Sequence, residues 1–189
     1  MKNTLGCLLL DASCLINIYA TGCLPEIAGT LPYQLGVAAY VLEREALYTW
    51  LSDQASTREE REPIDLSRLV DEGMIDVVHL EHPEERITFV DLAALVDDGE
   101  AVTGALALHR GCSVATDDRK ARRVLGGQVP SVPLVSTLEL LKLWAEEAAV
   151  PDTELRAAMI MMRSRASYLP GDRDPLYPWW SKVMCGATL

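Results

Sequence analysis

Short apolar runs alternate with longer segments of helical periodicity along most of the chain. Runs with the length of buried strands lie at 5–10, 35–37, 112–116 and 132–135. A further segment, 75–80, alternates between apolar and polar residues as a half-buried strand does. The intervening segments predict helices over 13–19, 40–51, 66–72, 87–95, 99–109, 119–125 and 137–149. The polar stretch 52–63 predicts a solvated helix end or a loop.

This alternation of strands and helices predicts an α/β fold. Helical connections between strands are typical of a parallel sheet covered on both faces, so we expect a three-layer α/β/α architecture with a short parallel sheet. We predict one such domain over residues 1–150. Residues 151–189 are an expected extension packed on it, with a helix over 153–167 and a segment rich in Pro and Trp over 169–180. The apolar side of this helix is expected to pack on the domain or on a second copy of the chain, so a homodimer is one candidate assembly.

Charge is distributed unevenly along the 189 residues. The chain has 28 acidic and 17 basic side chains and a net charge of −11, which at first argues against a protein that binds nucleic acid mainly by charge. Residues 58–100, however, carry fourteen acidic and four basic side chains, whereas residues 101–189 carry nine acidic and eleven basic ones. The acidity is therefore local. The acidic segment predicts a solvated face, or a surface for a basic segment of a partner protein.

The cysteines, the histidines and the hydropathy exclude several classes of protein. The five cysteines show no spacing typical of zinc ribbons or redox pairs, so we predict free structural thiols. The three histidines share no ligand spacing and are expected to be structural. No run approaches the roughly 18 apolar residues of a membrane span. We expect no membrane partner and a cytoplasmic location.

Acidic side chains follow two of the predicted strands and begin a helix near them. Because the carboxyl ends of parallel strands meet at one edge of the sheet, we expect these carboxylates to converge. Converging carboxylates repel one another unless a cation neutralises them, and oxygen-only ligands favour Mg²⁺ or Mn²⁺. Such a cluster suits metal-assisted hydrolysis of a phosphodiester. The candidates are Asp11, Glu43, Glu45, Glu100, Asp117 and Asp118.

The opening of the chain is similar to a known family. The run Leu-Leu-Leu-Asp-Ala-Ser-Cys-Leu-Ile-Asn resembles the first strand and first acid of PIN-domain proteins, a fold shared by toxin ribonucleases of toxin-antitoxin pairs and by several RNA-processing nucleases. This resemblance implies that Asp11 is a metal ligand. It also implies that Ser13 lies beside Asp11 as a supporting polar group, with Asn17 as a weaker candidate one helical turn later.

Two further stretches extend the resemblance, which covers about residues 5–145. The run Asp-Asp-Gly-Glu-Ala-Val-Thr-Gly resembles the family's helix that presents a third acid, which implies this role for Glu100. The run Val-Ala-Thr-Asp-Asp-Arg-Lys resembles the last acidic motif, in which a Thr or Ser precedes the acid by two positions. That spacing from Thr116 implies Asp118, with Asp117 as the adjacent alternative.

The second acid of the family lies on the helix after the second strand. Glu45 suits that position best, and Glu43 remains possible because the sequence Leu-Glu-Arg-Glu-Ala offers both. A simpler interpretation of several candidates also stands, because Asp11 and Asp118 each precede a predicted helix and Asp is a favoured helix cap.

The resemblance implies a Mg²⁺- or Mn²⁺-dependent endoribonuclease, with Asp11, Glu45, Glu100 and Asp118 as the catalytic acids. It raises the possibility of a toxin held by an antitoxin. A basic helix beside the last acids is expected to contact RNA phosphates through Arg119, Lys120, Arg122 and Arg123. The alternative function is a catalytically silent PIN-like module that binds RNA or a partner protein.

Overall fold

A five-stranded parallel sheet forms the centre of the computed structural model, which describes residues 6–46, 48–50 and 61–186. Its strand order is β5, β2, β1, β6, β7, so the first strand of the chain lies in the middle. The strands are β1 (Cys7–Leu10), β2 (Gln34–Ala38), β5 (Ile75–Val78), β6 (Ser113–Ala115) and β7 (Leu134–Val135). All the predicted strands are thereby confirmed within the described residues.

The central strand explains why the sequence is continuously apolar there. Leu8, Leu9 and Leu10 are each at most 1% exposed, and their strand pairs with β2 on one side and β6 on the other. A strand that is buried on both faces has no solvent side, so it does not alternate between polar and apolar residues. The hydrophobic core is built outward from β1 in both directions.

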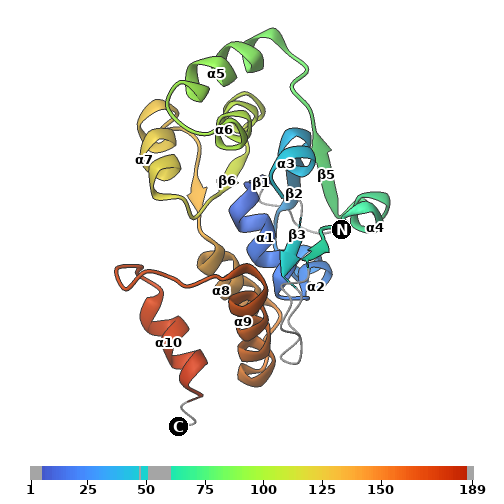
Figure 1. Cartoon of the computed structure of the whole chain (residues 1–189), viewed down its shortest axis with the longest axis vertical. Helices are drawn as coiled ribbons and strands as arrows, with labels where there is room; N and C mark the ends of the chain where they lie inside the picture. The colour runs from blue at the N-terminus through green and yellow to red at the C-terminus, as the bar shows by residue number, and fades with distance from the viewer. Residues whose placement is uncertain (1–5, 47, 51–60, 187–189) are drawn as a thin grey trace.

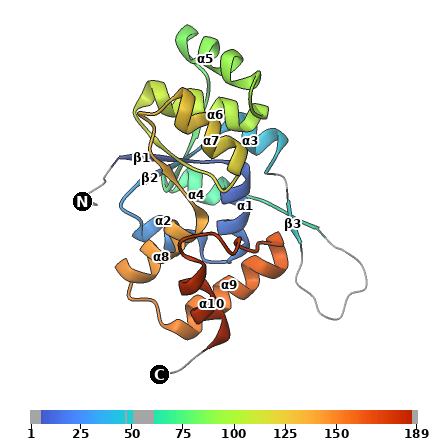
Figure 2. The ribbon, with the colours of Figure 1, turned by 90° about the vertical axis from the view of Figure 1, so that its left-hand side faces the viewer.

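Helices cover both faces of the sheet, which confirms the predicted three-layer α/β/α architecture. Figure 2 shows α5 (Pro83–Ala93), α6 (Asp98–Arg110) and α7 (Arg119–Gln128) on one side, and α2 (Leu24–Thr30), α8 (Thr137–Glu147) and α9 (Asp152–Ala166) on the other. The remaining helices are α1 (Ala12–Ala20), α3 (Ala39–Arg44), α4 (Ser67–Asp71) and α10 (Tyr177–Cys185). None of the helices within the described ranges has the length and hydropathy needed to cross a membrane.

The C-terminal extension shares the core of the preceding residues. Leu155, Met159 and Met162 of α9 are buried, and this helix lies against α1. The next helix, α10, packs on α9 and buries Trp180. Between the two helices, residues 167–176 pass beside α8 (Figure 1). The predicted helix 153–167 is therefore present, and its apolar side faces the rest of the chain.

Two expectations from the sequence are wrong in detail. The helix predicted over 40–51 ends at Arg44, and Tyr48–Trp50 instead forms strand β3, which pairs antiparallel with β4 (Arg61–Pro63). Aromatic and β-branched residues favour a strand here over the helical pattern. The segment predicted as a loop over 52–63 thus ends in a strand, while residues 51–60 and position 47 lie outside the described residues. Helix α2 was not expected, because its seven residues include only a short apolar pattern.

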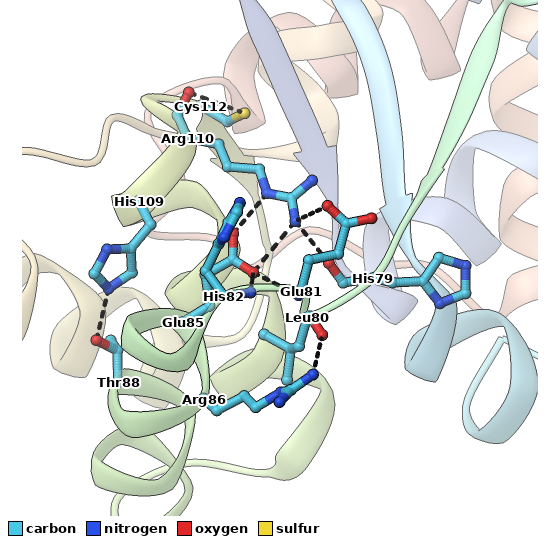
Figure 3. Close-up of polar contacts among 10 residues, drawn as sticks. All are labelled: His79, Leu80, Glu81, His82, Glu85, Arg86, Thr88, His109, Arg110 and Cys112. Carbon is cyan, nitrogen blue, oxygen red and sulfur yellow. Dashed lines mark hydrogen bonds and ion pairs between the residues drawn. The ribbon is translucent and has the colours of Figure 1, made fainter.

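A buried ion pair ties the helical hairpin of α5 and α6 to the end of β5 (Figure 3). The Arg110 Nε donates to Glu85 Oε1 over 2.8 Å, and its Nη2 donates to the carbonyl of His79 over 2.7 Å. The Glu85 side chain is 1% exposed and also accepts from the backbone N–H groups of Glu81 and His82. The Arg110 guanidinium lowers the pKa of Glu85 to about 2. Every hydrogen-bonding position of this buried carboxylate is thus compensated.

Removing one partner of this pair is expected to cost far more than removing an exposed pair. Arg110→Ala leaves the Glu85 carboxylate buried without its cation, so the free energy of unfolding at pH 7 should fall by about 3 kcal/mol or more. Arg68→Ala, which breaks the exposed pair between Arg68 and Glu72, is the control and should cost less than about 1 kcal/mol. Urea denaturation measures both, and equal losses would contradict the structural role of Arg110.

Candidate functional site

The candidate site lies at the edge where β1 and β6 end. Asp11 directly follows β1, and its backbone N–H donates to the carbonyl of Ala115 over 3.0 Å, which extends the pairing of β1 with β6 by one residue. Asp117 and Asp118 follow β6 after Thr116. Parallel pairing of neighbouring strands therefore brings the first and last predicted acids to the same edge of the sheet.

Asp11 is a buried carboxylate with three local donors. It is the N-cap of α1, where its Oδ1 accepts from the backbone of Cys14 over 2.7 Å and from the Ser13 hydroxyl over 2.9 Å. The side chain is 3% exposed, and burial raises its pKa to about 6 despite these donors and the Thr116 hydroxyl, which favour the charged form. Ser13 thus supports Asp11 as the sequence predicts. The helix-cap interpretation is confirmed for this residue, and its role as a metal ligand stays a prediction.

Asp117 connects three segments of the fold. Its Oδ2 accepts from the Asn17 side chain over 3.0 Å and from the Thr137 hydroxyl over 2.5 Å, while its Oδ1 accepts from the Thr137 backbone N–H over 2.9 Å. Both oxygens are therefore occupied by donors from α1 and from the first residue of α8. This makes Asp117 a structural tie between α1 and α8, and Asn17 is one of its donors. A metal-supporting role for either residue stays a prediction.

Asp118 has a different environment from its neighbour. Its side chain is exposed and caps α7, with Oδ1 accepting from the Ala121 backbone over 2.7 Å. The Thr116 hydroxyl accepts from the Asp118 backbone N–H over 3.2 Å and so fixes the turn that presents this acid. Within the described part of the chain, Oδ2 of Asp118 accepts no hydrogen bond. Of the two adjacent acids, Asp118 is the one with an oxygen available to a ligand.

The charges of other acids raise the pKa of Glu100. This residue occupies the third position of α6, where Oε2 accepts from the Asp97 backbone over 3.1 Å. Burial raises the pKa of Glu100, and the carboxylates of Asp118, Asp97 and Asp11 raise it further. Asp11, Glu100 and Asp118, from three separate elements, therefore form one electrostatic group.

Glu45 reaches the same helix terminus from α3. It caps the end of α3, and its Oε1 accepts from the Gly99 backbone over 3.0 Å. A Cβ at position 99 would lie 1.9 Å from Glu45 Oε2, so only glycine leaves room for the carboxylate. Burial raises the pKa of Glu45, and Asp97 and Asp98 raise it further. Glu45 is thus placed against Gly99 at the N-terminus of α6. Glu43 is exposed, and no contact joins it to the other described acids.

The candidate acids supply the oxygen ligands that a hard divalent cation prefers, but they are not arranged around a common point as the ligands of a metal site are. Asp11, Glu45, Glu100 and Asp118 supply only oxygen ligands, and the pKa values of the first three are raised, which a nearby cation would reverse. In residues 6–46, 48–50 and 61–186, however, no three His, Cys, Asp or Glu side chains are arranged as a group that could hold a metal ion. Binding would require rotation of the more exposed carboxylates.

Basic residues and a cleft lie next to Asp117 and Asp118. On α7, Arg119, Lys120 and Arg123 are exposed, while Arg122 is half-buried and donates to the Thr116 carbonyl over 2.9 Å. The start of α7, the start of α8 and residues 168–176 enclose a cleft of about 650 Å³. Sequence reasoning does not predict this position of the extension, because nothing in its Pro-rich pattern indicates which edge of the sheet it covers.

Comparison of the chain with protein-family models, with characterised proteins and with solved structures finds no match.

The burial of Asp11 is expected to make stability depend on pH when no metal is present. Its pKa is 3.8 in the unfolded reference and about 6 in the fold, so between these values the unfolded chain loses its proton first. The free energy of unfolding should therefore fall as the pH rises from about 4 to about 6, by an amount on the order of 2 kcal/mol. Asp11→Asn, which retains the helix cap, should lack this component. Urea denaturation in EDTA across this range measures the difference, and parallel curves for the two proteins would contradict it.

Substitution of the two adjacent acids is expected to lower the free energy of unfolding by different amounts. Asp117→Ala removes the acceptor for Asn17 and Thr137, so it should lower the free energy of unfolding by about 2 kcal/mol or more. Asp118→Ala removes only a helix cap and should cost about 1 kcal/mol. Thermal and urea denaturation measure both variants. A larger loss for the Asp118 variant would reverse the assignment of the structural tie.

Proposed function

We propose that the chain is a metal-dependent endoribonuclease in which Asp11, Glu45, Glu100 and Asp118 hold Mg²⁺ or Mn²⁺. One observation carries the proposal: Asp11 and Asp118 follow the neighbouring parallel strands β1 and β6 at the carboxyl edge of the sheet, and burial, together with the charges of Asp118, Asp97 and Asp11, raises the pKa of Glu100. Ligands in open parallel sheets bind at this edge. The resemblance of residues 5–145 to PIN-domain proteins supports the same assignment of acids.

The electrostatics of the site favour a cation. Uncompensated carboxylates at close range are unfavourable, and the buried Asp11 has no cationic side chain among its hydrogen-bond partners. The buried Glu85 is the contrast within the same chain, because Arg110 neutralises it and lowers its pKa. A divalent ion at the candidate site would neutralise the Asp11 carboxylate as Arg110 neutralises that of Glu85.

Each residue of the proposed site would have a distinct role in hydrolysis. A bound ion supplies an activated water and stabilises the charge that develops on the phosphate. Asp11 is held rigidly by Ser13 and the backbone of Cys14, so it fixes the position of the ion. Asp118 and Glu100 each have one oxygen without a hydrogen bond in the described structure and so remain free to rotate toward a ligand. The exposed cations of α7 then lie next to the RNA backbone.

A second function, a module that binds RNA or a protein without cleaving, is favoured by one observation. The acids of the described residues are not arranged as a ready metal-binding group. Titration with Mn²⁺, followed by calorimetry, separates the two functions. An enzyme with this site should bind the ion stoichiometrically and lose binding in Asp11→Asn, whereas a silent module should bind none.

Cleavage of RNA is expected to depend on Asp11 and on the metal. Asp11→Asn preserves the cap of α1 but removes a ligand charge, so cleavage of a labelled RNA in Mn²⁺ should fall by about 100-fold or more, beyond what loss of an outer-sphere partner costs. Asp91→Asn, an exposed acid on α5, is the matched control and should cleave like wild type. Equal rates for wild type and Asp11→Asn would refute the assignment.

A further inference from the structure

The cleft beside the acids is built partly by the C-terminal extension. Its volume is about 650 Å³, and the wall opposite α7 and α8 comes from residues 168–176. The charged and hydroxyl side chains that line it are Asp117, Arg119, Arg122, Ser136, Glu139, Tyr168, Arg173 and Asp174. Asp117, the neighbour of Asp118 in the chain, also lines the cleft, so the cleft begins next to the candidate site.

The extension approaches α7 and the acids closely. A Cβ on Gly171 would lie 2.8 Å from Nη2 of Arg119, so the backbone of the extension runs directly against this guanidinium. The Tyr168 hydroxyl is partly buried, and both its burial and the charge of Asp117 raise its pKa. The extension therefore lies against Arg119 at Gly171, and Tyr168 lies within electrostatic range of Asp117.

The acids that line the cleft are already engaged by backbone donors. Asp117 accepts from Thr137, Glu139 accepts from the backbone of Ser136 over 2.6 Å, and Asp174 accepts from the backbone of Leu176 over 2.7 Å. These contacts hold the negative charges in the walls.

The arginines of the cleft make fewer hydrogen bonds with described residues than its acids do. Arg122 donates one bond to the Thr116 carbonyl. Arg119 and Arg173 make no hydrogen bond and no ion pair with any described residue. Two guanidinium groups from opposite walls of one cleft are thus available to a ligand. Guanidinium groups match phosphate oxygens in geometry and charge.

We propose that this cleft binds a backbone phosphate of the RNA strand that enters the candidate site, held between Arg119 of α7 and Arg173 of the extension. The proposal rests on the proposed function and adds a subsite to it. Arg173 is then a positioning residue, because it holds the strand without touching the reacting phosphate. The extension becomes part of the substrate cleft instead of only a support for the core.

Binding measured without metal tests this subsite separately from cleavage. A fluorescein-labelled single-stranded RNA is titrated with the full chain in EDTA, and anisotropy gives Kd over a series of salt concentrations. Arg173→Ala should raise Kd several-fold and reduce the slope of log Kd against log salt by about 0.7, the value for one phosphate contact to a single strand. Arg173→Lys retains the charge and should keep most of the slope.

The control is Arg163→Ala, an exposed arginine on α9 that does not line the cleft. Its Kd and slope should equal those of wild type, and thermal melting should show both alanine variants folded. If Arg173→Ala binds like Arg163→Ala, or if wild type binds no RNA, the subsite is overturned. If Arg173 governs binding but wild type does not cleave RNA with Mn²⁺, the proposed function fails and the subsite stands.

Discussion

The carboxylate of Asp117 joins parts of the fold that are far apart in the chain. It accepts from Asn17 on α1 and from both the backbone and the hydroxyl of Thr137 at the start of α8. These contacts hold the connection between β6 and α7 against α1 and α8. Because this turn also carries Asp118 and opens α7, the positions of the exposed acid and of the basic helix both depend on one hydrogen-bonded carboxylate.

Glu85 and Asp11 are both buried carboxylates, but they differ in the groups that stabilise their charge. Glu85 is neutralised by Arg110 and by backbone donors, and its pKa falls. Asp11 has only neutral donors, and its pKa rises. Glu85, with Arg110 as its cation, stabilises the fold at neutral pH, whereas burial of Asp11 without a cationic hydrogen-bond partner among the described residues favours its protonated form. The contrast separates a structural acid from a candidate ligand without reference to any other protein.

The sequence predicted the parallel sheet and most helices because burial on both faces leaves a strong apolar signal, as in Leu8, Leu9 and Leu10. It indicated that Asp11 and Asp118 lie at one edge of the sheet, because the carboxyl ends of neighbouring parallel strands meet there. That Glu100 joins them around a metal stays a prediction. Sequence reasoning failed where long-range contacts decide the outcome. The helix pattern after Arg44 yields to pairing between β3 and β4, and the choice between Asp117 and Asp118 depends on Thr137, twenty residues later.

The origin of the cleft wall in residues 168–176 bears on the order in which the molecule is assembled during synthesis. All the candidate acids have emerged once residue 118 is made, and Thr137 follows soon after to hold Asp117. The opposite wall, with Tyr168 and Arg173, emerges some 50 residues after the last acid. Because N-terminal parts of a chain can begin to fold first, the cleft is completed only after the extension has been synthesised and has docked.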